Sequence, residues 1–199
     1  DEHFPLFNAC GAIDASRDHG DGDLLYARGY EPGFPGAVEW FANNGAGSFG
    51  AGQRVATAYE MIPDDVSLGD VDNDGVTDIV VSGLLFDMGS IAVARGLGGG
   101  SFAPGVSYYS GRGTHNVSAR DVDGDGLDDV ICTHSWSQTV KIFRPGLDGA
   151  IELPPTSWFN SQFGYDPVVG DLDNDGDLDA LVAESAVVAA LLNDGSGQF

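Results

Sequence analysis

The chain has 199 residues, 42% of them hydrophobic, which is enough for one large or two small domains with a buried core. Its 31 acidic residues against 8 basic ones give a formal net charge of −23, which excludes a basic nucleic-acid-binding surface and disfavours attachment to an anionic membrane. No apolar run reaches the roughly 18 residues of a membrane-spanning helix, and 30 glycines with 9 prolines favour tight turns over long helices.

Four copies of one unit follow one another along the chain. The first, IDASRDHGDGDLLYARG, is irregular because one residue is inserted near His19. The other three align without gaps, at a spacing of 51 and 50 residues. They are GDVDNDGVTDIVVSG (69–83), RDVDGDGLDDVICTH (120–134) and GDLDNDGDLDALVAE (170–184). The corresponding repeats cover approximately residues 9–58, 65–114, 116–165 and 166–199.

A Gly-rich segment trails each acidic loop, at 38–49, 91–102, 140–151 and 188–199. Pieces such as DIVVSG and VKIFRP are too short and too rich in β-branched residues for helices, so they predict strands. Each unit then contains four strands joined by an acidic loop, a variable loop and a Gly-rich turn. A four-stranded antiparallel unit that repeats about every 50 residues predicts an all-β fold, a β-propeller of about four four-stranded blades. A parallel β-solenoid has much shorter repeats.

The acidic loops share the pattern D-x-D-x-D-G-x-x-D. As such a loop curls, side chains at positions 1, 3 and 5 converge, the glycine permits the turn, position 7 offers a backbone carbonyl and position 9 closes the shell. Oxygen ligands of this kind favour Ca²⁺ over the smaller Mg²⁺, and a set without sulfur or imidazole disfavours zinc and copper. The pattern therefore predicts three calcium sites. They are Asp70, Asp72, Asp74 and Asp78 with the Val76 carbonyl; Asp121, Asp123, Asp125 and Asp129 with the Leu127 carbonyl; and Asp171, Asp173, Asp175 and Asp179 with the Asp177 carbonyl.

Two other interpretations of the loops are weaker. An EF-hand needs a glutamate at position 12 and a helix on each side, whereas position 12 here is Val81, Cys132 or Val182 inside a predicted strand. A merely solvated acidic turn explains one copy, but not three ungapped copies.

The first, irregular copy keeps part of the pattern. Asp14, Ser16, Asp18 and Asp23 form a possible fourth calcium site with an altered loop. Arg17 and the insertion argue against it, so the occupancy of this loop stays open.

These motifs resemble the FG-GAP/VCBS repeats of integrin α-subunit propellers and of many secreted bacterial and algal proteins. The resemblance covers essentially the whole chain, residues 1–199. It implies that each calcium loop joins the first and second strands of a blade, that the ions are mainly structural, and that the protein is exported to the cell surface, the extracellular space or an organelle lumen.

The number of blades is an open question, because propellers of this family usually have seven and this chain has four repeats. Either the chain forms a small four-bladed ring, with residues 1–8 supplying the outer strand of the last blade, or it is part of a larger propeller. The second alternative is slightly favoured.

Enzymatic motifs are scarce. The four histidines are scattered along the sequence, and no serine or cysteine lies in a nucleophile motif. We therefore expect a non-catalytic protein.

The variable loops, expected on the face opposite the calcium loops, are rich in aromatic residues, which are common in protein and sugar contact surfaces. The candidates for partner binding are Tyr59, Tyr108, Tyr109, Trp136, Trp158 and Phe159. Packing between blades is the alternative role for each of them. We expect an adhesion or scaffold module that binds another protein through this face. Lectin-like carbohydrate binding, or an accessory domain of a larger secreted polysaccharide-processing enzyme, are the alternatives.

Overall fold

The computed structural model describes residues 8–13, 22–28, 37–55, 61–85, 88–134, 136–137, 139–146, 148, 150–152, 156–159, 167–183 and 188–199. Every regular element in these ranges is a β-strand, which confirms the all-β prediction. The described residues contain no helix long and apolar enough to cross a membrane.

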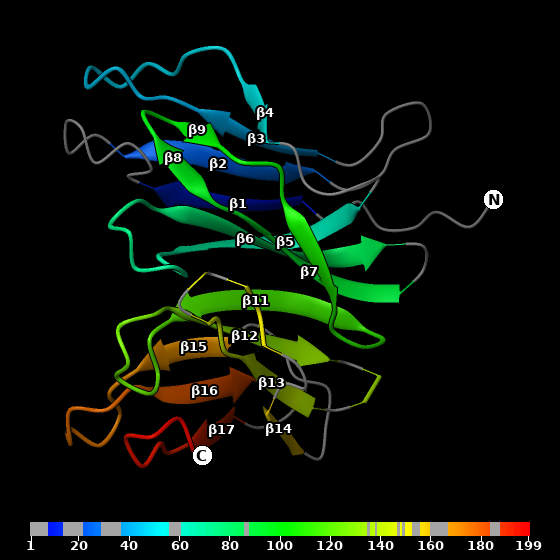
Figure 1. Ribbon diagram of the computed structural model, residues 1–199, viewed down its shortest axis with the longest axis vertical. Helices are drawn as coiled ribbons and strands as arrows, with labels where there is room; N and C mark the ends of the chain where they lie inside the picture. Colours follow the sequence, from blue (N-terminus) through cyan, green and yellow to red (C-terminus); the bar gives the residue numbers. More distant parts are fainter. Residues whose placement is uncertain are drawn as a thin grey trace.

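The strands form four consecutive antiparallel sheets, which we call blades 1 to 4 (Figure 1). Blade 1 contains β1 (Asn8–Ile13), β2 (Asp23–Arg28), β3 (Ala37–Phe41) and β4 (Gln53–Val55). Blade 2 contains β5 (Ile62–Gly69), β6 (Asp78–Leu85), β7 (Met88–Ala94) and β10 (Val106–Tyr109). Blade 3 contains β11 (Thr114–Arg120), β12 (Asp129–His134), β13 (Thr139–Phe143) and β14 (Thr156–Phe159). Blade 4 contains β15 (Pro167–Gly170), β16 (Asp179–Ala183) and β17 (Val188–Leu191). The two-stranded hairpin of β8 (Gly96–Gly98) and β9 (Ser101–Phe102) lies between β7 and β10 in sequence.

The second strand of a blade is apolar on both faces because it lies between two other blades. In β6, Ile79 and Val81 point toward blade 1, whereas Val80 points toward blade 3, and all three are fully buried. Successive side chains of a strand point to opposite faces, so a strand covered on both sides appears in the sequence as a continuous β-branched run. This explains the apolar runs IVV (79–81) in repeat 2 and VIC (130–132) in repeat 3.

Among the described residues, the hydrophobic core forms three clusters, each between two consecutive blades. The first joins Leu25 and Trp40 to Ile79, the second joins Ile91 to Val130, and the third joins Ile142 to Val182. The blades follow one another as an open stack, with blade 1 at one end and blade 4 at the other (Figure 1).

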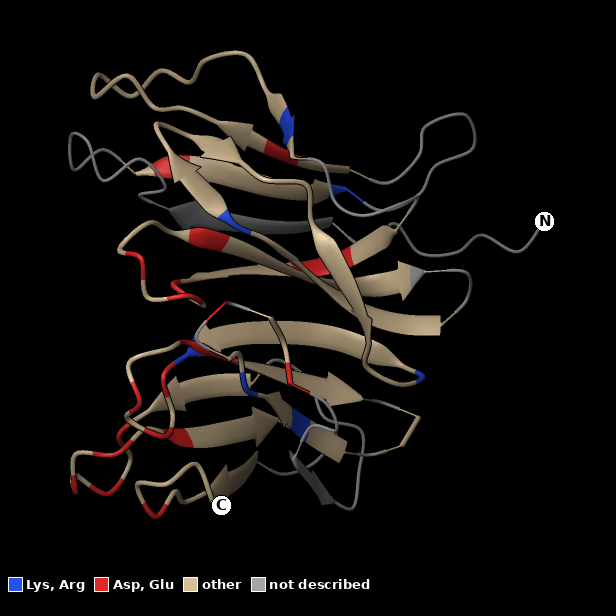
Figure 2. Ribbon diagram, viewed as in Figure 1, with Lys and Arg blue, Asp and Glu red and all other residues tan. Residues whose placement is uncertain are grey.

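The acidic loops all connect the first and second strands of their blades. Residues 70–77, 121–128 and 171–178 therefore lie along one edge of the stack, where Figure 2 shows most of the acidic residues. The turns between the second and third strands lie at the opposite ends of the second strands.

Four aromatic residues that we expected in variable loops lie in strands instead. Tyr108 and Tyr109 belong to β10, and Trp158 and Phe159 belong to β14. Both are outer strands of their blades, paired only with the third strand. Apolar and polar residues alternate only weakly in these two strands. Edge strands of this kind are therefore hard to distinguish from loops in the sequence.

Candidate metal centres in the acidic loops

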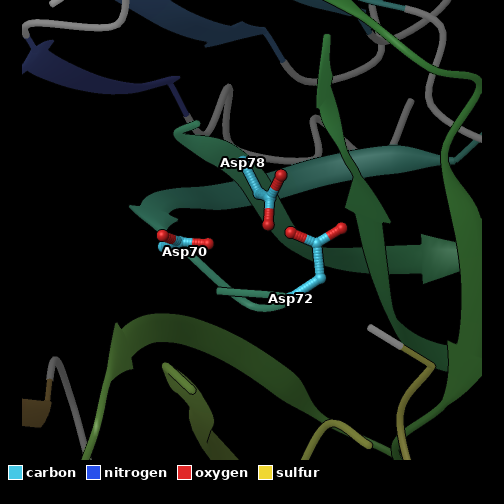
Figure 3. A group of neighbouring side chains, drawn as sticks. All are labelled: Asp70, Asp72 and Asp78. Atoms are coloured by element: carbon cyan, nitrogen blue, oxygen red, sulfur yellow. The ribbon is translucent and has the colours of Figure 1, made fainter. Parts of the chain in front are cut away.

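Three aspartates converge in each regular loop. In the second repeat, Asp70, Asp72 and Asp78 each place one carboxylate oxygen within 4.8 Å of the others (Figure 3). The equivalent residues in the next two repeats form groups of the same size, listed in chain order as Asp121, Asp123 and Asp129, then Asp171, Asp173 and Asp179. Positions 1, 3 and 9 of the pattern thus meet in all three loops.

The position 1 carboxylate holds the loop in its curled form. Asp70 accepts hydrogen bonds from the backbone N–H groups of Asp74 (3.1 Å) and Gly75 (3.0 Å). The glycine at position 6 has φ of 83° in Gly75, 93° in Gly126 and 101° in Gly176. This left-handed region disfavours residues with a Cβ atom, which explains the glycine in each copy.

The position 9 carboxylate connects the loop to the Gly-rich turn that follows the third strand. Asp78 is fully buried and accepts hydrogen bonds from the N–H groups of Val71 (2.8 Å) and Gly96 (2.7 Å). Asp179 makes the same two bonds with Leu172 and Asn193. Burial raises the pKa of Asp78 to about 6, although these hydrogen bonds favour the carboxylate.

Asp129 has a weaker set of donors. It accepts a hydrogen bond of 3.3 Å from the Val122 N–H group, but strand register places Pro145, which has no N–H group, where Asp78 meets Gly96. Burial and the nearby Asp123 raise the pKa of Asp129 to about 7. A bound cation would lower the cost of keeping this carboxylate charged.

The donor set fits a hard divalent cation. Two like charges about 4 Å apart repel by roughly 1 kcal/mol in water and by about 4 kcal/mol at the effective dielectric constant of a protein surface. In addition, Oδ1 of Asp72 is buried and has no hydrogen-bond partner. A metal ion at the centre of the group would remove the repulsion and satisfy this oxygen. The three groups can therefore hold metal ions, and their all-oxygen chemistry is of the kind that suits calcium.

Positions 5 and 7 remain predicted ligands. Asp74, Asp125 and Asp175 are exposed and do not belong to the converging groups. Each accepts a hydrogen bond from the N–H group of position 7, for example 2.7 Å from Val76 to Asp74.

In the first repeat, Asp14, Ser16 and Asp18 lie outside the described residues, so the fourth calcium site stays a prediction. Asp23 is described and buried. It accepts hydrogen bonds from the Asn43 N–H group (2.7 Å) and from Nε1 of Trp40 (3.1 Å). It therefore fixes the Gly-rich turn of blade 1 as Asp78 does in blade 2.

Asp128 has a role that we did not anticipate from the sequence. Its carboxylate accepts hydrogen bonds from the N–H groups of Asp70 (2.8 Å) and Asp121 (2.9 Å), and its own N–H group donates to the Asp70 carbonyl (3.0 Å). It thus connects the loops of blades 2 and 3. The only sign in the sequence is that position 8 holds an acidic residue in this loop, whereas the other two loops have Thr77 and Leu178 there.

Two arginines were also missed. Nε of Arg144 donates to Asp123 (2.7 Å), and Nη2 donates to the Gly197 carbonyl (3.1 Å) in the last turn of blade 4. Arg95, at the equivalent place in blade 2, lies 3.6 Å from Asp72. The sequence offered one signal for them. Each arginine directly follows a third strand, and the chain has only 8 basic residues.

The six residues predicted to bind a partner are not brought together as one described surface. Trp136 is 73% exposed in the turn between β12 and β13, and Tyr109 is 57% exposed on β10. Tyr108 packs against the second core cluster. Tyr59 and the side chains of Trp158 and Phe159 lie outside the described residues.

A pocket of about 350 Å³ adjoins the acidic loop of blade 2. Asp72, Asp74 and Arg95 form its charged side, and the exposed Leu97 and Val106 belong to its apolar side. It therefore lies on the edge of the stack that carries the acidic loops.

Comparison with solved structures gives a neighbour with the same fold. It is an Agrocybe aegerita lectin, whose structure describes the specific recognition of non-reducing terminal N-acetylglucosamine. The two are 22% identical, and the match covers 96% of this chain and 50% of the lectin chain with a TM-score of 0.64. The chain therefore spans about half the length of this lectin. No curated protein matches the chain.

The family comparison agrees with the repeats and the loops. The model of the FG-GAP-like repeat matches residues 18–81 and 121–182, more than half of the chain. Repeats of this family and propeller lectins are typical of non-catalytic binding modules. With its acidic loops between the first and second strands of successive antiparallel blades, this β-propeller chain belongs to the FG-GAP-like repeat family.

Proposed function

We propose that the chain is a calcium-binding, non-catalytic module of an exported protein, in which ions in the acidic loops hold adjacent blades in place for partner binding. The observation that carries this proposal is the convergence of three aspartates within 4.8 Å in each regular loop. When bound, calcium would neutralise these carboxylates. Asp128 would couple the ions of two blades, because its carboxylate is hydrogen-bonded to the acidic loops of both blade 2 and blade 3.

The thiol of Cys132 lies next to the imidazole of His134, but this pair does not argue for catalysis. Cys132 Sγ and His134 Nε2 are 4.0 Å apart, but both side chains are buried. Burial raises the pKa of the Cys132 thiol and lowers the pKa of His134 to about 4, so both groups stay neutral near pH 7. A buried, neutral thiol is a poor nucleophile.

Calcium titration calorimetry tests the metal assignment. We expect three ions per chain from the regular loops, or four if the first loop is occupied. The double variant Asp70→Asn/Asp72→Asn should lose one ion and leave the remaining sites unchanged. A wild-type chain that binds no calcium would contradict the proposal.

The partner is proposed to be another protein that docks on the face opposite the acidic loops. Trp136 supports this, because it is 73% exposed and tryptophan is among the residues enriched at binding hot spots. Carbohydrate binding is the second candidate. It is supported by the likeness to a lectin and by the pocket beside Asp72 and Arg95, whose volume suits a small ligand.

A glycan array, probed with and without calcium, separates the two candidates. Binding that is lost in Arg95→Ala and kept in Trp136→Ala would favour the carbohydrate. An array without any binding, combined with a protein ligand whose affinity falls about thirtyfold in Trp136→Ala, would favour the protein partner.

A further inference from the structure

The pocket beside the acidic loop of blade 2 has an apolar side built on two paired strands. Val93 in β7 is the strand partner of Val106 in β10, so the two side chains lie on one face of the blade. Leu97 and Pro104, from the segment between these strands, extend the apolar side. Leu97 is 67% and Val106 is 51% exposed, so a ligand can reach this side directly.

Arg95 lines the same pocket and keeps donors for a ligand. A guanidinium group has five N–H donors. Among the described residues, the only ion pair of Arg95 is with Asp72, and its 3.6 Å between Nη1 and Oδ2 is longer than a hydrogen bond. Arg144, at the equivalent place in blade 3, instead donates to Asp123 and to the Gly197 carbonyl. Of the two arginines, Arg95 is therefore the one that can donate to a ligand.

The charges of the pocket favour a neutral ligand with several hydroxyl groups. The carboxylates of Asp72 and Asp74 and the guanidinium of Arg95 line one small space. An anion would meet the carboxylates there and a cation would meet the guanidinium, whereas a hydroxyl group both donates and accepts hydrogen bonds. The volume of about 350 Å³ is near the lower end of the usual range for ligand pockets, about 300–1,000 Å³. A sugar ring, with an apolar C–H face and polar edges, matches this combination.

Two contacts connect the pocket to the candidate metal centre of blade 2. Asp72 belongs both to the converging group and to the pocket (Figure 3). Gly96, which also lines the pocket, donates its N–H group to Asp78 of the same group at 2.7 Å. The turn that begins there is closed by a hydrogen bond of 2.8 Å from the Ala103 N–H group to the Arg95 carbonyl. A change of charge in the loop therefore acts on residues of the pocket.

The charge of Asp72 affects the position of the Arg95 guanidinium. Without a metal ion, the Asp72 carboxylate attracts this guanidinium toward the loop. If Asp70, Asp72 and Asp78 share a divalent ion, the charge of Asp72 is directed to the ion and its attraction for Arg95 weakens. The Arg95 donors are then free to bind a ligand in the pocket.

We propose that this pocket binds a neutral sugar ring only when the loop of blade 2 holds calcium. Arg95 donates to oxygens of the sugar, Asp74 accepts from a hydroxyl group, and Leu97 and Val106 cover the apolar face of the ring. This inference rests on the calcium sites of the proposed function and gives one of them a role in ligand recognition. Because coupling between two sites is reciprocal, the sugar must raise the calcium affinity of this loop by the same factor by which calcium raises the sugar affinity.

Ligand-observed NMR with glucose, galactose, mannose and N-acetylglucosamine, each with calcium and with chelator, tests the proposal. At least one sugar should bind in calcium, and its dissociation constant should rise about tenfold or more in chelator. The chelator measurements are made below the melting temperature of the metal-free chain, so that loss of folding does not contribute.

Two arginine variants locate the site. Arg95→Gln should weaken sugar binding about tenfold in calcium, while titration calorimetry finds as many bound calcium ions as in the wild type. Arg112→Gln is the matched control, because Arg112 is exposed and follows β10 at the end of the strand away from Val106. It should bind the sugar as the wild type does.

Calcium titrations with and without saturating sugar give a second measurement. One calcium site should gain affinity with the sugar, and the gain should disappear in Arg95→Gln. A chain that binds calcium but none of the four sugars, or that binds a sugar equally well in chelator or in Arg95→Gln, overturns this proposal and leaves the calcium sites standing. Preferential binding of glucuronic acid or glucosamine overturns the choice of a neutral ligand. A chain that binds no calcium overturns the proposed function together with this inference.

Discussion

Asp78 illustrates how one side chain combines two roles. Its oxygens accept hydrogen bonds from Val71 and Gly96, and one of them also faces the carboxylates of Asp70 and Asp72. Asp74, by contrast, is exposed and accepts a single bond from Val76 within the loop. Both residues belong to the same sequence pattern, but the structure predicts that their substitution has different consequences.

We expect Asp78→Ala to destabilise the protein even without metal. The change leaves two backbone N–H groups without acceptors, at a cost of about 1–3 kcal/mol each. Asp74→Ala should cost less than about 1 kcal/mol in chelator, and should reveal its effect only with calcium, as the loss of one bound ion. Urea unfolding with chelator and with calcium measures both. Equal losses in chelator would show that Asp78 does not fix the Gly-rich turn.

The aspartate pattern was predictable from the sequence, whereas Asp128 was not. The three regular loops repeat with constant spacing, so their glycines and carboxylates could be identified by alignment alone. Asp128 occupies a variable position, and its bond to Asp70 joins residues 58 positions apart in different repeats. A contact of this kind depends on how the blades stack, which the pattern within one repeat does not contain.

At the level of strands and turns, Arg144 connects two blades. It leaves the end of β13, pairs with Asp123 in the loop of its own blade, and reaches the Gly197 carbonyl of the final turn. The loop of blade 3 is thereby fixed to the last turn of blade 4. Arg95 is at the same place in blade 2, but its contact with Asp72 is longer, at 3.6 Å, and 44% of its side chain is exposed.

We expect Arg144→Gln to lower the free energy of unfolding by about 1.5–3 kcal/mol, the usual contribution of hydrogen bonds to a charged group. The matched variant Arg95→Gln should lose less than about 1 kcal/mol, as is usual for an exposed ion pair. Both unfolding curves should be measured with chelator, so that changes in calcium affinity do not contribute. An equal loss in the two variants would contradict a connection between blades through Arg144.

Inner strands were predicted more accurately than outer ones, and packing explains the difference. The second strands, such as β6 and β12, are buried on both faces and have unbroken apolar runs. The outer strands β10 and β14 pair on one side only, so Tyr109 and Trp158 were assigned to loops. The sequence likewise contains no signal for which aromatic side chains cover a core and which stay exposed.

At the scale of the whole molecule, the dominant feature is the concentration of negative charge along one edge of the stack (Figure 2). The formal net charge is −23, and each regular loop holds three carboxylate groups within 4.8 Å of one another. The apolar clusters between blades must therefore hold together a molecule whose loops repel one another. Cations bound in the loops would reduce this repulsion within each loop, and Asp128 is hydrogen-bonded to the loops of both blade 2 and blade 3.

We therefore expect a chelator to lower the melting temperature clearly, and calcium to restore it. Binding to the folded state alone adds about 2.7 kcal/mol per site at a hundredfold excess over the dissociation constant. Magnesium should restore the melting temperature poorly, because it requires a smaller, strictly octahedral shell. Sodium chloride at the same ionic strength is the control, since it screens exposed charges without filling the loops. If salt alone restored the melting temperature as fully as calcium, the stabilisation would come from general screening, and the loops would not act as specific metal centres.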